Sequence, residues 1–215
     1  MVMMMKPKKL VYGVGNNDAD YVTQRFETIG YVSGEQKQKL VWKCPYYERW
    51  GHMLARCYSA KYQENKPTYK GCSVSTEWHT FSSFRMWMEG QDWQGKHLDK
   101  DLLFEGNKVY SHETCVFVSP LVNTFTIDSG AARGELMIGV SWHKRDGKFE
   151  SRCKNPFTKK GEYLGQFTCE VEAHEAWLKR KQELAHELAA IQTDERVAKA
   201  LVDRYSKPYT DKDLK

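Results

Sequence analysis

Residues 139–177, GVSWHKRDGKFESRCKNPFTKKGEYLGQFTCEVEAHEAW, decide how the carboxy-terminal part of this chain folds. Over residues 148–154 charged side chains alternate strictly with less polar ones, and this period of two is typical of a strand with one buried face. Phe149, Ser151 and Cys153 would point toward a core, and the alternate positions would point outward. The stretch as a whole predicts three short strands, two basic turns and the beginning of a helix.

The outer side of this expected sheet is basic. Residues 139–165 contain seven lysines and arginines but three acids, although the whole chain has a formal net charge of only +5. A sheet with a cationic outer face and a helix behind it can be laid into a DNA groove, so double-stranded DNA is the expected partner, and an ordinary solvated strand face is the alternative. The candidates for groove contacts are Ser141, His143, Arg145, Lys148, Glu150, Arg152 and Lys154, and those for phosphate contacts are Lys144, Lys159 and Lys160.

The composition is that of a folding sequence. Of the 215 residues 40% are hydrophobic and 13% are aromatic, which separates the chain from disordered proteins. No apolar run approaches the roughly 18 residues that cross a bilayer, and the Met-rich start is too short for a signal-peptide core. We therefore expect no membrane partner, a cytoplasmic location and reduced cysteines.

The cysteine spacing favours buried hydrophobic roles over a metal site. No CxxC pair occurs in the chain, and that spacing is common in structural zinc sites. A structural Zn²⁺ therefore remains the minor alternative, and small buried thiols are the favoured interpretation. The residues that a zinc site would use are Cys44, Cys57, Cys72 and Cys115 with His79 or His52.

Apolar periodicity and capping residues predict several helices upstream of the basic sheet. An amphipathic helix should follow Pro45, a second helix should follow Ser75 or Thr76, and a third should open at Ser119. Between the last two, residues 102–110 have the pattern of a hairpin around a Gly-Asn turn. The first 42 residues are expected to form an extended arm with some local order.

Two helices are expected after the sheet. Apolar residues from Ala173 to Ile191 define a long helix, and Thr193 or Asp194 would cap a final one. A Gly- and Ser-containing stretch before the sheet, residues 127–137, has the chemistry of a linker.

The carboxy-terminal segment resembles the Apetala-type DNA-binding domain of plant transcription factors and phage endonucleases. That family has a GV pair, then GKW-x-A-x-I, then LG-x-F, then an alanine-rich helix. The resemblance covers about fifty residues and implies a three-stranded DNA-binding sheet. The matching residues are Gly139-Val140, Lys148-Phe149 with Ser151 and Cys153, Leu164-Gly165-Gln166-Phe167, and Ala173 with Ala176.

Residues 44–125 resemble the HNH-type homing endonucleases of phages. One branch of that family has a Trp-x-x-Met-x-x-Arg-Cys-Tyr helix, a Trp…Phe…Phe helix, an acidic hairpin and a Tyr-Ser-x-x-Asn-Cys motif. If the resemblance holds, the chain acts in the cytoplasm of the host cell. The matching residues are Trp50, Met53, Arg56-Cys57-Tyr58, Trp78, Phe81, Phe84, Leu98-Asp99-Lys100-Asp101 and Tyr110-Ser111-His112-Glu113-Thr114-Cys115.

Together these patterns give an α+β fold class. An amino-terminal helical and HNH-like ββα-metal domain would precede a three-stranded antiparallel sheet with a packed helix and a final carboxy-terminal helix. The expected parts are an arm (1–43), a nuclease domain (44–126), a linker (127–137), an Apetala-type domain (138–192) and a helix with a tail (193–215).

The HNH resemblance implies one divalent metal held against a scissile phosphate. Asp99 and Asn123 stand where the two metal ligands of the family fall, and oxygen donors of this kind suit Mg²⁺ or Mn²⁺. The position of the general base departs from the family. Lys100 stands where a histidine is usual, and an ordinary lysine keeps its proton at neutral pH.

Other residues near Lys100 are candidate substitutes for the missing base. His97, His112 and Asp101 flank it in sequence, and Thr114 replaces the asparagine that usually orients the base. The sequence therefore predicts a phage-type, site-directed DNA endonuclease with metal ligands Asp99 and Asn123. The alternatives are a catalytically degenerate DNA-binding or regulatory protein and a protein that contacts a host factor. The oligomeric state is left open.

Overall fold

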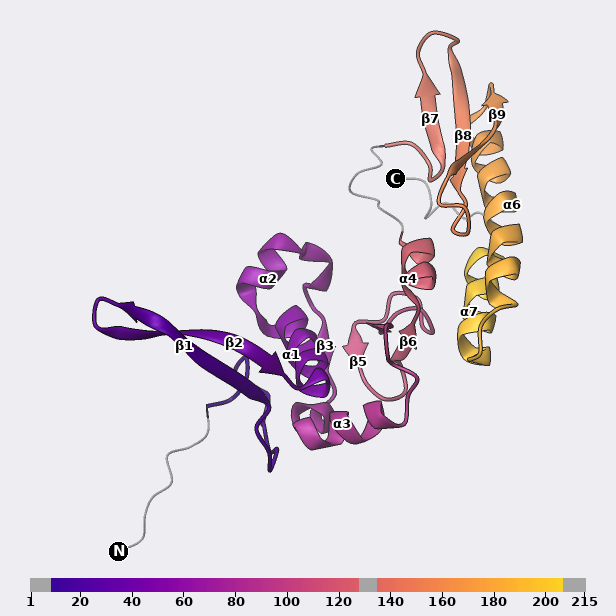
Figure 1. Ribbon diagram of the computed structural model, residues 1–215. Helices are drawn as coiled ribbons and strands as arrows, with labels where there is room; N and C mark the ends of the chain where they lie inside the picture. The colour runs from indigo at the N-terminus through magenta and orange to yellow at the C-terminus, as the bar shows by residue number, and fades with distance from the viewer. Residues whose placement is uncertain (1–8, 128–134, 207–215) are drawn as a thin grey trace, which may run out of the picture. The chain divides into compact units, whose positions relative to one another are not determined.

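The computed structural model describes residues 9–127 and 135–206, which are drawn as ribbons in Figure 1. The described part of the chain is mixed α+β, with six α-helices and several small sheets. It divides into two compact units: residues 9–94 with 106–115, and residues 95–105 with 116–127 and 135–206. No helix among the described residues is long and apolar enough to span a membrane.

The first unit begins with a β-hairpin and continues with short helices. Strands β1 and β2 pair antiparallel through a two-residue turn in which Ser33 and Gly34 both have positive φ, the backbone that tight hairpin turns require. The elements are β1 (Gln24–Val32), β2 (Glu35–Lys43), α1 (Pro45–Tyr58), α2 (Ala60–Asn65), η1 (Pro67–Tyr69), β3 (Ser73–Val74), η2 (Thr76–His79), α3 (Phe81–Glu89) and β5 (Val109–Tyr110).

An aromatic core holds the helices of the first unit together. Trp50 of α1 is fully buried and donates its indole N–H to the carbonyl of Trp78 at 2.7 Å. Phe81 lies 5.4 Å from the Trp50 ring, and Phe84 meets Trp78 edge to face at 5.1 Å. The amphipathic helix expected after Pro45 is confirmed, whereas the helix expected after Ser75 is split into η2 and α3.

The hairpin expected over residues 102–110 is wrong. Val109 and Tyr110 form β5, which pairs parallel with β3, and the chain before them turns instead of extending. The cause is Asp99, whose carboxylate accepts hydrogen bonds from the backbone N–H groups of Asp101 at 2.9 Å and Leu102 at 2.7 Å. A local side-chain acceptor of this kind competes with strand pairing.

The second unit contains a small ββα group and a larger sheet-and-helix group. Strands β4 and β6 pair antiparallel, α4 packs against both, and Ser119 caps α4 by accepting the backbone N–H of Val122 at 3.2 Å. The remaining strands form an antiparallel sheet in the order β7-β8-β9. The elements are β4 (His97–Asp99), β6 (Val116–Val118), α4 (Pro120–Thr126), β7 (Val140–His143), β8 (Lys148–Lys154), β9 (Gly161–Phe167), α6 (Glu170–Ala189) and α7 (Glu195–Ser206).

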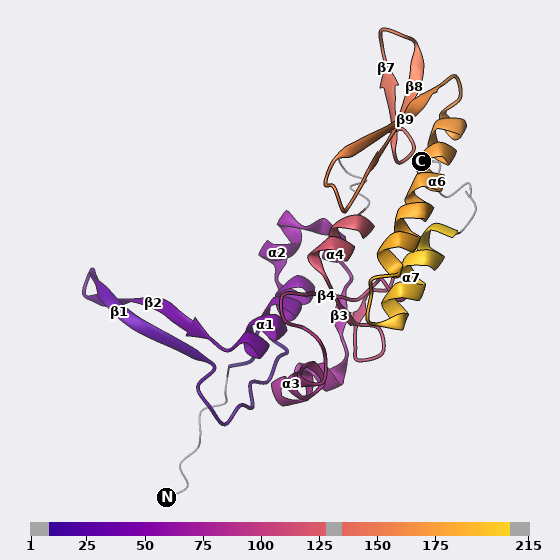
Figure 2. The same cartoon turned by 45° about the vertical axis from the view of Figure 1, so that its right-hand side comes forward.

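The alternation expected in β8 is confirmed. Ser151 and Cys153 are fully buried, Phe149 is half-buried, and helix α6 covers their side of the sheet, as Figure 2 shows. Gly139, which opens β7, has φ +82° and lies so close to Trp177 of α6 that an added Cβ would stand 2.1 Å from the indole ring. Only glycine allows this approach of backbone to helix.

One apolar core extends through the second unit. It joins Val118 and Val122 of the ββα group to Leu184 of α6 and Leu201 of α7. The cap expected for the last helix is confirmed, because the Asp194 carboxylate accepts the N–H of Arg196 at 2.9 Å. The long helix ends at Ala189, and Ile191 is exposed instead of belonging to its apolar stripe.

Candidate nucleic-acid interface and metal centre

The outer face of the three-stranded sheet gathers most of the expected DNA-contacting side chains. The register pairs Ser141 with Glu150 and His143 with Lys148, so both strands present these four residues on the same side. Lys148, Arg152 and Lys154 are exposed, as alternation within β8 requires. Glu150 is also on this face, where it accepts a hydrogen bond from the Arg152 guanidinium. The face is therefore cationic with one internally paired acid.

Two further residues lie on this face that the sequence did not indicate as candidates for DNA contacts. Tyr163 of β9 pairs with Arg152, is 56% exposed, and lies 5.8 Å from the guanidinium carbon. Gln166 pairs with Glu150 and is likewise on the outer side. A bulge next to Arg152 interrupts the register between β8 and β9, so alternation along β9 alone does not assign these faces.

The β7–β8 turn is held by an acid at its centre. Asp146 accepts hydrogen bonds from Arg145 Nε at 2.9 Å and Gln166 Nε2 at 3.0 Å, and its carboxylate lies 3.1 Å from His143 Nδ1. The bonds from Arg145 and Gln166 hold the pKa of Asp146 below its usual value. Lys144 in the same turn is exposed. The turn thus presents its basic groups in a fixed conformation.

The β8–β9 turn is likewise ordered by one polar side chain. The side-chain oxygen Oδ1 of Asn155 accepts hydrogen bonds from the backbone N–H groups of Phe157 at 2.8 Å and Thr158 at 3.1 Å. The turn closes through Lys159, which has φ +59°, and it leaves Lys159 and Lys160 exposed. Both lysines therefore add to the exposed positive charge at this end of the sheet.

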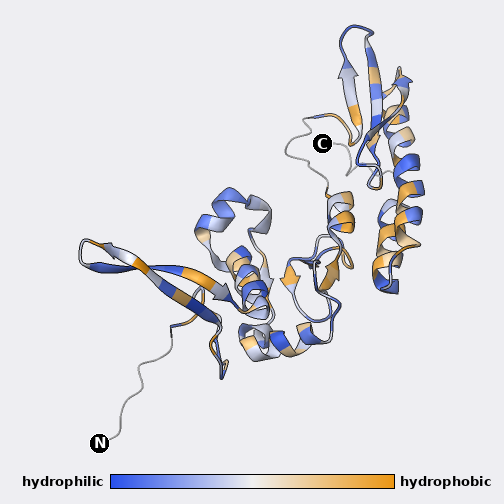
Figure 3. Ribbon diagram, in the orientation of Figure 1, coloured by the Kyte–Doolittle hydropathy of each residue, from blue (hydrophilic) through white to orange (hydrophobic). Residues whose placement is uncertain are grey.

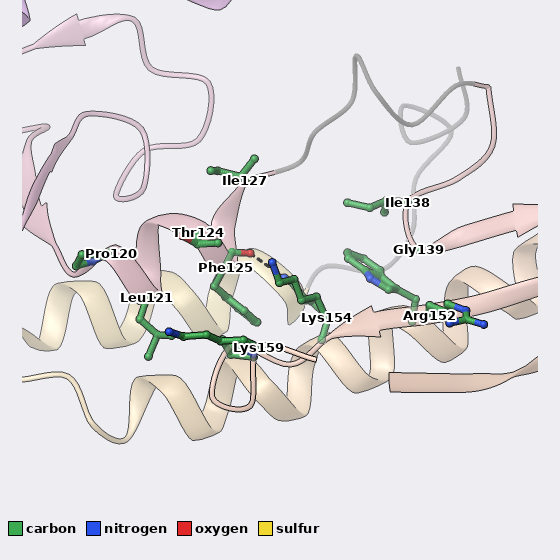
Figure 4. Close-up of a pocket in the computed structure, with 13 residues that line it drawn as sticks. Pro120, Leu121, Thr124, Phe125, Ile127, Ile138, Gly139, Arg152, Lys154 and Lys159 are labelled. Atoms are coloured by element: carbon green, nitrogen blue, oxygen red, sulfur yellow. Dashed lines mark hydrogen bonds between the residues drawn. The ribbon is translucent and has the colours of Figure 1, made fainter. Parts of the chain in front are cut away.

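A pocket of about 800 Å³ opens at this end of the sheet (Figure 4). Aliphatic and aromatic side chains of α4, of Ile127 and Ile138, and of Trp177 on α6 form much of its wall, and all four charged lining residues are cationic. These four residues are Arg152, Lys154, Lys159 and Lys181. The basic surface of the sheet thus continues toward helix α4.

Lys181 connects helix α6 to the end of α4. Its ammonium donates to the carbonyl of Phe125 at 2.7 Å, the hydrogen bond drawn in Figure 4, and lies 3.6 Å from the centre of the Phe125 ring. The Tyr205 hydroxyl of α7 donates to the same carbonyl at 3.2 Å. Burial lowers the pKa of Lys181 to about 8. A cation at the carboxyl end of α4 also interacts favourably with the partial negative charge of the helix dipole at that end.

Asp99 stands at the end of β4 and has two roles available. One carboxylate oxygen accepts the turn N–H groups, and the carboxyl group also makes a side-chain hydrogen bond with Asp101, with which a bound metal would compete. Burial, and then the negative charge of Asp101, raise the pKa of Asp99. A divalent cation beside this carboxylate would favour its ionised form and relieve that electrostatic cost.

Lys100 and Asp101 form an ion pair next to Asp99. Lys100 is buried, and its ammonium donates to an Asp101 oxygen at 2.9 Å. Burial alone would raise the pKa of Asp101, but the hydrogen bond and charge of Lys100 lower it below its ordinary value. The carboxylate of Asp101 is therefore ionised at neutral pH, as a proton acceptor must be.

The remaining base candidates are distributed over both units. His97 opens β4 and is exposed in the second unit. His112 and Thr114 belong to the first unit. There His112 pairs with Glu77 at 3.3 Å, and the Thr114 hydroxyl donates to the carbonyl of Val109 at 2.7 Å. The Thr114 hydroxyl is thus used within its own turn.

Asn123 lies on α4, the helix that packs against β4. It is half-buried, and its amide makes no hydrogen bond within the described residues. Its carbonyl oxygen and a carboxylate oxygen of Asp99 are hard donors of the kind that Mg²⁺ accepts, and Mg²⁺ retains several waters when few protein ligands bind it. The donor set therefore fits this ion.

No group of three or more histidine, cysteine, aspartate or glutamate residues in the described part of the chain is close enough to share an ion. The four cysteines considered for zinc are buried, and none of them forms a disulfide.

The fold and this geometry define an α+β chain with a cationic sheet and a small ββα group. Comparison with protein-family models, with curated proteins and with solved structures finds no match to this chain.

Proposed function

We propose that this chain binds duplex DNA through the outer face of β7-β8-β9 and hydrolyses a phosphodiester at a single divalent metal held by Asp99 and Asn123. The observation that carries the proposal is the segregation of charge on this sheet. Lys148, Arg152 and Lys154 are exposed on one side, while α6 seals the other side. A cationic strand face of this size suits the major groove, where arginine can read guanine edges.

The residues of the ββα group have distinct roles in this proposal. Asp99 and Asn123 would bind the ion, and its charge would stabilise the negative charge that develops on the phosphate. Asp101, held ionised by Lys100, is the best placed of the second-unit candidates to accept a proton from water. The buried ammonium of Lys100 also orients that carboxylate.

Nicking of supercoiled plasmid with Mg²⁺ or Mn²⁺ tests the hydrolytic step. We expect Asp99→Asn and Asn123→Ala to lower the rate at least 100-fold, because each removes a metal ligand. The amide in Asp99→Asn still accepts the N–H groups of Asp101 and Leu102, so the turn should survive. Asp203→Asn, which changes an exposed carboxylate on α7, is the matched control. Unchanged nicking by both ligand variants would refute the metal assignment.

The second candidate is a DNA-binding protein that does not cut. It is favoured by Lys100, whose buried ammonium occupies the position expected for the base. This alternative predicts salt-sensitive duplex binding with no cleavage under any divalent metal. A plasmid library of random sequence, incubated with Mg²⁺ and with Mn²⁺, separates the two candidates.

A further inference from the structure

The pocket of the second unit has the size and the lining of a ligand site. Its volume of about 800 Å³ lies within the range of small-molecule pockets, roughly 300–1,000 Å³. Figure 3 shows hydrophobic positions along α4 and α6, two helices that contribute to its wall. Ligand pockets combine an apolar wall of this kind with a few polar groups that fix the orientation of the ligand. The apolar wall has no role in the proposed binding or cleavage of DNA.

The buried part of the pocket wall is aromatic and held in place. Phe125 is 4% exposed and Trp177 is 7% exposed, and both belong to the apolar core that joins α4 to α6. Lys181 and Tyr205 both donate to the Phe125 carbonyl, and Gly139 lies against the Trp177 indole. A pocket whose walls are already packed needs little ordering when a ligand binds.

Exposed cations border this aromatic wall. Arg152, Lys154 and Lys159 line the pocket and are exposed (Figure 4), and no acidic residue of the described chain lines it. Arg152 already bonds to Glu150. Lys154 and Lys159 make no ion pair with any residue that the structure describes. The pocket therefore has a positive potential, which an anionic group on the ligand would complement.

The uncharged side chains of the wall offer few hydrogen-bonding groups. The Thr124 hydroxyl and the Trp177 indole N–H are the only such groups, and no side-chain amide or carboxylate of a described residue lines the pocket. A nucleobase has several donors and acceptors along its edge, and burying them without partners is unfavourable. The body of the ligand should therefore be an apolar ring system and not a base.

We propose that this pocket binds a small organic anion with an aromatic body. The rings would lie against Phe125 and Trp177, where edge-to-face and offset contacts between aromatic groups are favourable. A carboxylate on the rings would pair with the ammonium groups of Lys154 and Lys159. No lining residue is a proposed metal ligand, so binding of the anion does not depend on the proposed hydrolysis of DNA.

Isothermal titration calorimetry of the full chain with naphthoate tests this proposal. We expect a dissociation constant below about 1 mM, which is reasonable for a ligand of this size. Naphthalenemethanol has the same rings but no charge, and it should bind at least fivefold more weakly. No measurable binding of naphthoate, or equal affinities for the acid and the alcohol, would overturn the proposal. Tighter binding of deoxyadenosine monophosphate than of naphthoate would also overturn it and assign the pocket to nucleotides.

Two matched double variants locate the anionic group. Replacing Lys154 and Lys159 by Gln should weaken the binding of naphthoate at least fivefold but change that of naphthalenemethanol less than twofold. Replacing Lys148 and Lys160 by Gln removes the same charge from the same strand and turn, but from exposed residues that do not line the pocket. This control should change neither affinity more than twofold. Equal weakening of naphthoate by the two variants would mean that the net charge of the sheet attracts the anion and that the pocket does not.

A single apolar substitution locates the rings. Ile127→Gln on the pocket wall should weaken the binding of the acid and of the alcohol alike, at least threefold. Ile191→Gln is the matched control, because Ile191 is 60% exposed, compared with 58% for Ile127, and does not line the pocket. If Ile127→Gln leaves both affinities unchanged, or if Ile191→Gln lowers them as much, the ligand binds elsewhere on the chain and the proposal is wrong.

Discussion

The β7-β8-β9 sheet and the β1–β2 hairpin are both built from alternating strands, but only the sheet has a covered side. Helix α6 seals the side of β8 that carries Ser151 and Cys153, so alternation there separates core from surface. In the hairpin the same alternation separates two faces that are both exposed from residue 25 to residue 42, except at Gly30. A period of two therefore shows which residues share a face, and the packing element decides what each face does.

The largest expected difference between these two regions concerns a buried charge. Cys153→Asp would place a carboxylate at a fully buried position under α6, and we expect a loss of at least about 3 kcal/mol in the free energy of unfolding. Gln38→Asp makes the corresponding change on the hairpin and should alter that free energy by less than about 0.5 kcal/mol. Urea unfolding measures both.

Comparable losses in the two variants would show that the hairpin is covered by part of its own chain. Comparable tolerance would show that the inner side of β8 is open. Either result would remove the contrast between a sheet with one covered side and a hairpin with two exposed faces.

The next largest effect is expected in DNA binding. Replacing Lys148, Arg152 and Lys154 together by Gln removes three charges from the outer face of the sheet, and we expect affinity to fall about 100-fold. The log–log dependence of affinity on salt should become shallower by about 2.7, because each phosphate contact contributes a slope of roughly 0.9. Fluorescence anisotropy with a labelled duplex over a range of salt concentrations gives both quantities.

The hairpin offers a control with the same change in net charge. Replacing Arg25, Lys37 and Lys39 by Gln also removes three cations, but from one face of the β1–β2 hairpin. We expect the salt slope to change by less than about 0.5. Equal slopes for the two triple variants would mean that the chain attracts DNA through net charge alone and not through the sheet.

A smaller effect is expected from the pH dependence of stability on the covered side of the sheet. Burial lowers the native pKa of Lys181 to about 8, whereas the unfolded chain keeps an ordinary lysine value. Between these values the unfolded state binds more protons, so the contribution of Lys181 to stability rises with pH. The difference in unfolding free energy, wild type minus Lys181→Met, should grow by about 1–2 kcal/mol from pH 7 to 9.5.

The subtraction matters because other groups titrate in the opposite sense. Burial raises the pKa of Cys153, and burial together with Cys44 raises that of Tyr21 to about 12, so each loses its proton later in the native state. Their contributions to stability fall with rising pH. The contribution of Tyr21 is shared by both proteins and cancels, whereas that of Cys153 cancels only in part, because the charge of Lys181 lowers the pKa of Cys153. A difference that stays flat from pH 7 to 9.5 would show that the aromatic rings around Lys181 offset its burial.

Local sequence rules predicted the elements whose own residues determine them. The α1 and α7 helices, the α4 cap at Ser119 and the buried face of β8 all follow from periodicity and capping groups close in sequence. The failures involve longer-range or competing contacts. Asp99 turns the chain where a strand was expected, and β5 pairs with β3, which is more than thirty residues earlier.

The candidate site follows the same rule. The family resemblance pointed to Asp99 and Asn123, which lie on elements that pack together, but it did not show that Lys100 is buried against Asp101. It also missed Tyr163, because the outward position of that residue depends on a bulge in the pairing of β8 with β9. The only signal in the sequence was an aromatic residue between the charged Glu162 and the LGQF motif, and that signal does not determine a face.

The smallest expected effect concerns Tyr163. Its ring lies beside the Arg152 guanidinium on the outer face, so Tyr163→Ala should weaken duplex binding two- to fivefold by freeing that arginine to move. Tyr163→Phe keeps the ring and should bind as wild type does, while Tyr31→Ala removes an exposed tyrosine from the hairpin and should leave affinity for DNA unchanged. If Tyr163→Phe loses as much as Tyr163→Ala, the hydroxyl contacts DNA directly. If Tyr31→Ala also weakens binding, then aromatic residues of both regions contact the duplex, and the sheet is not the only DNA-binding surface.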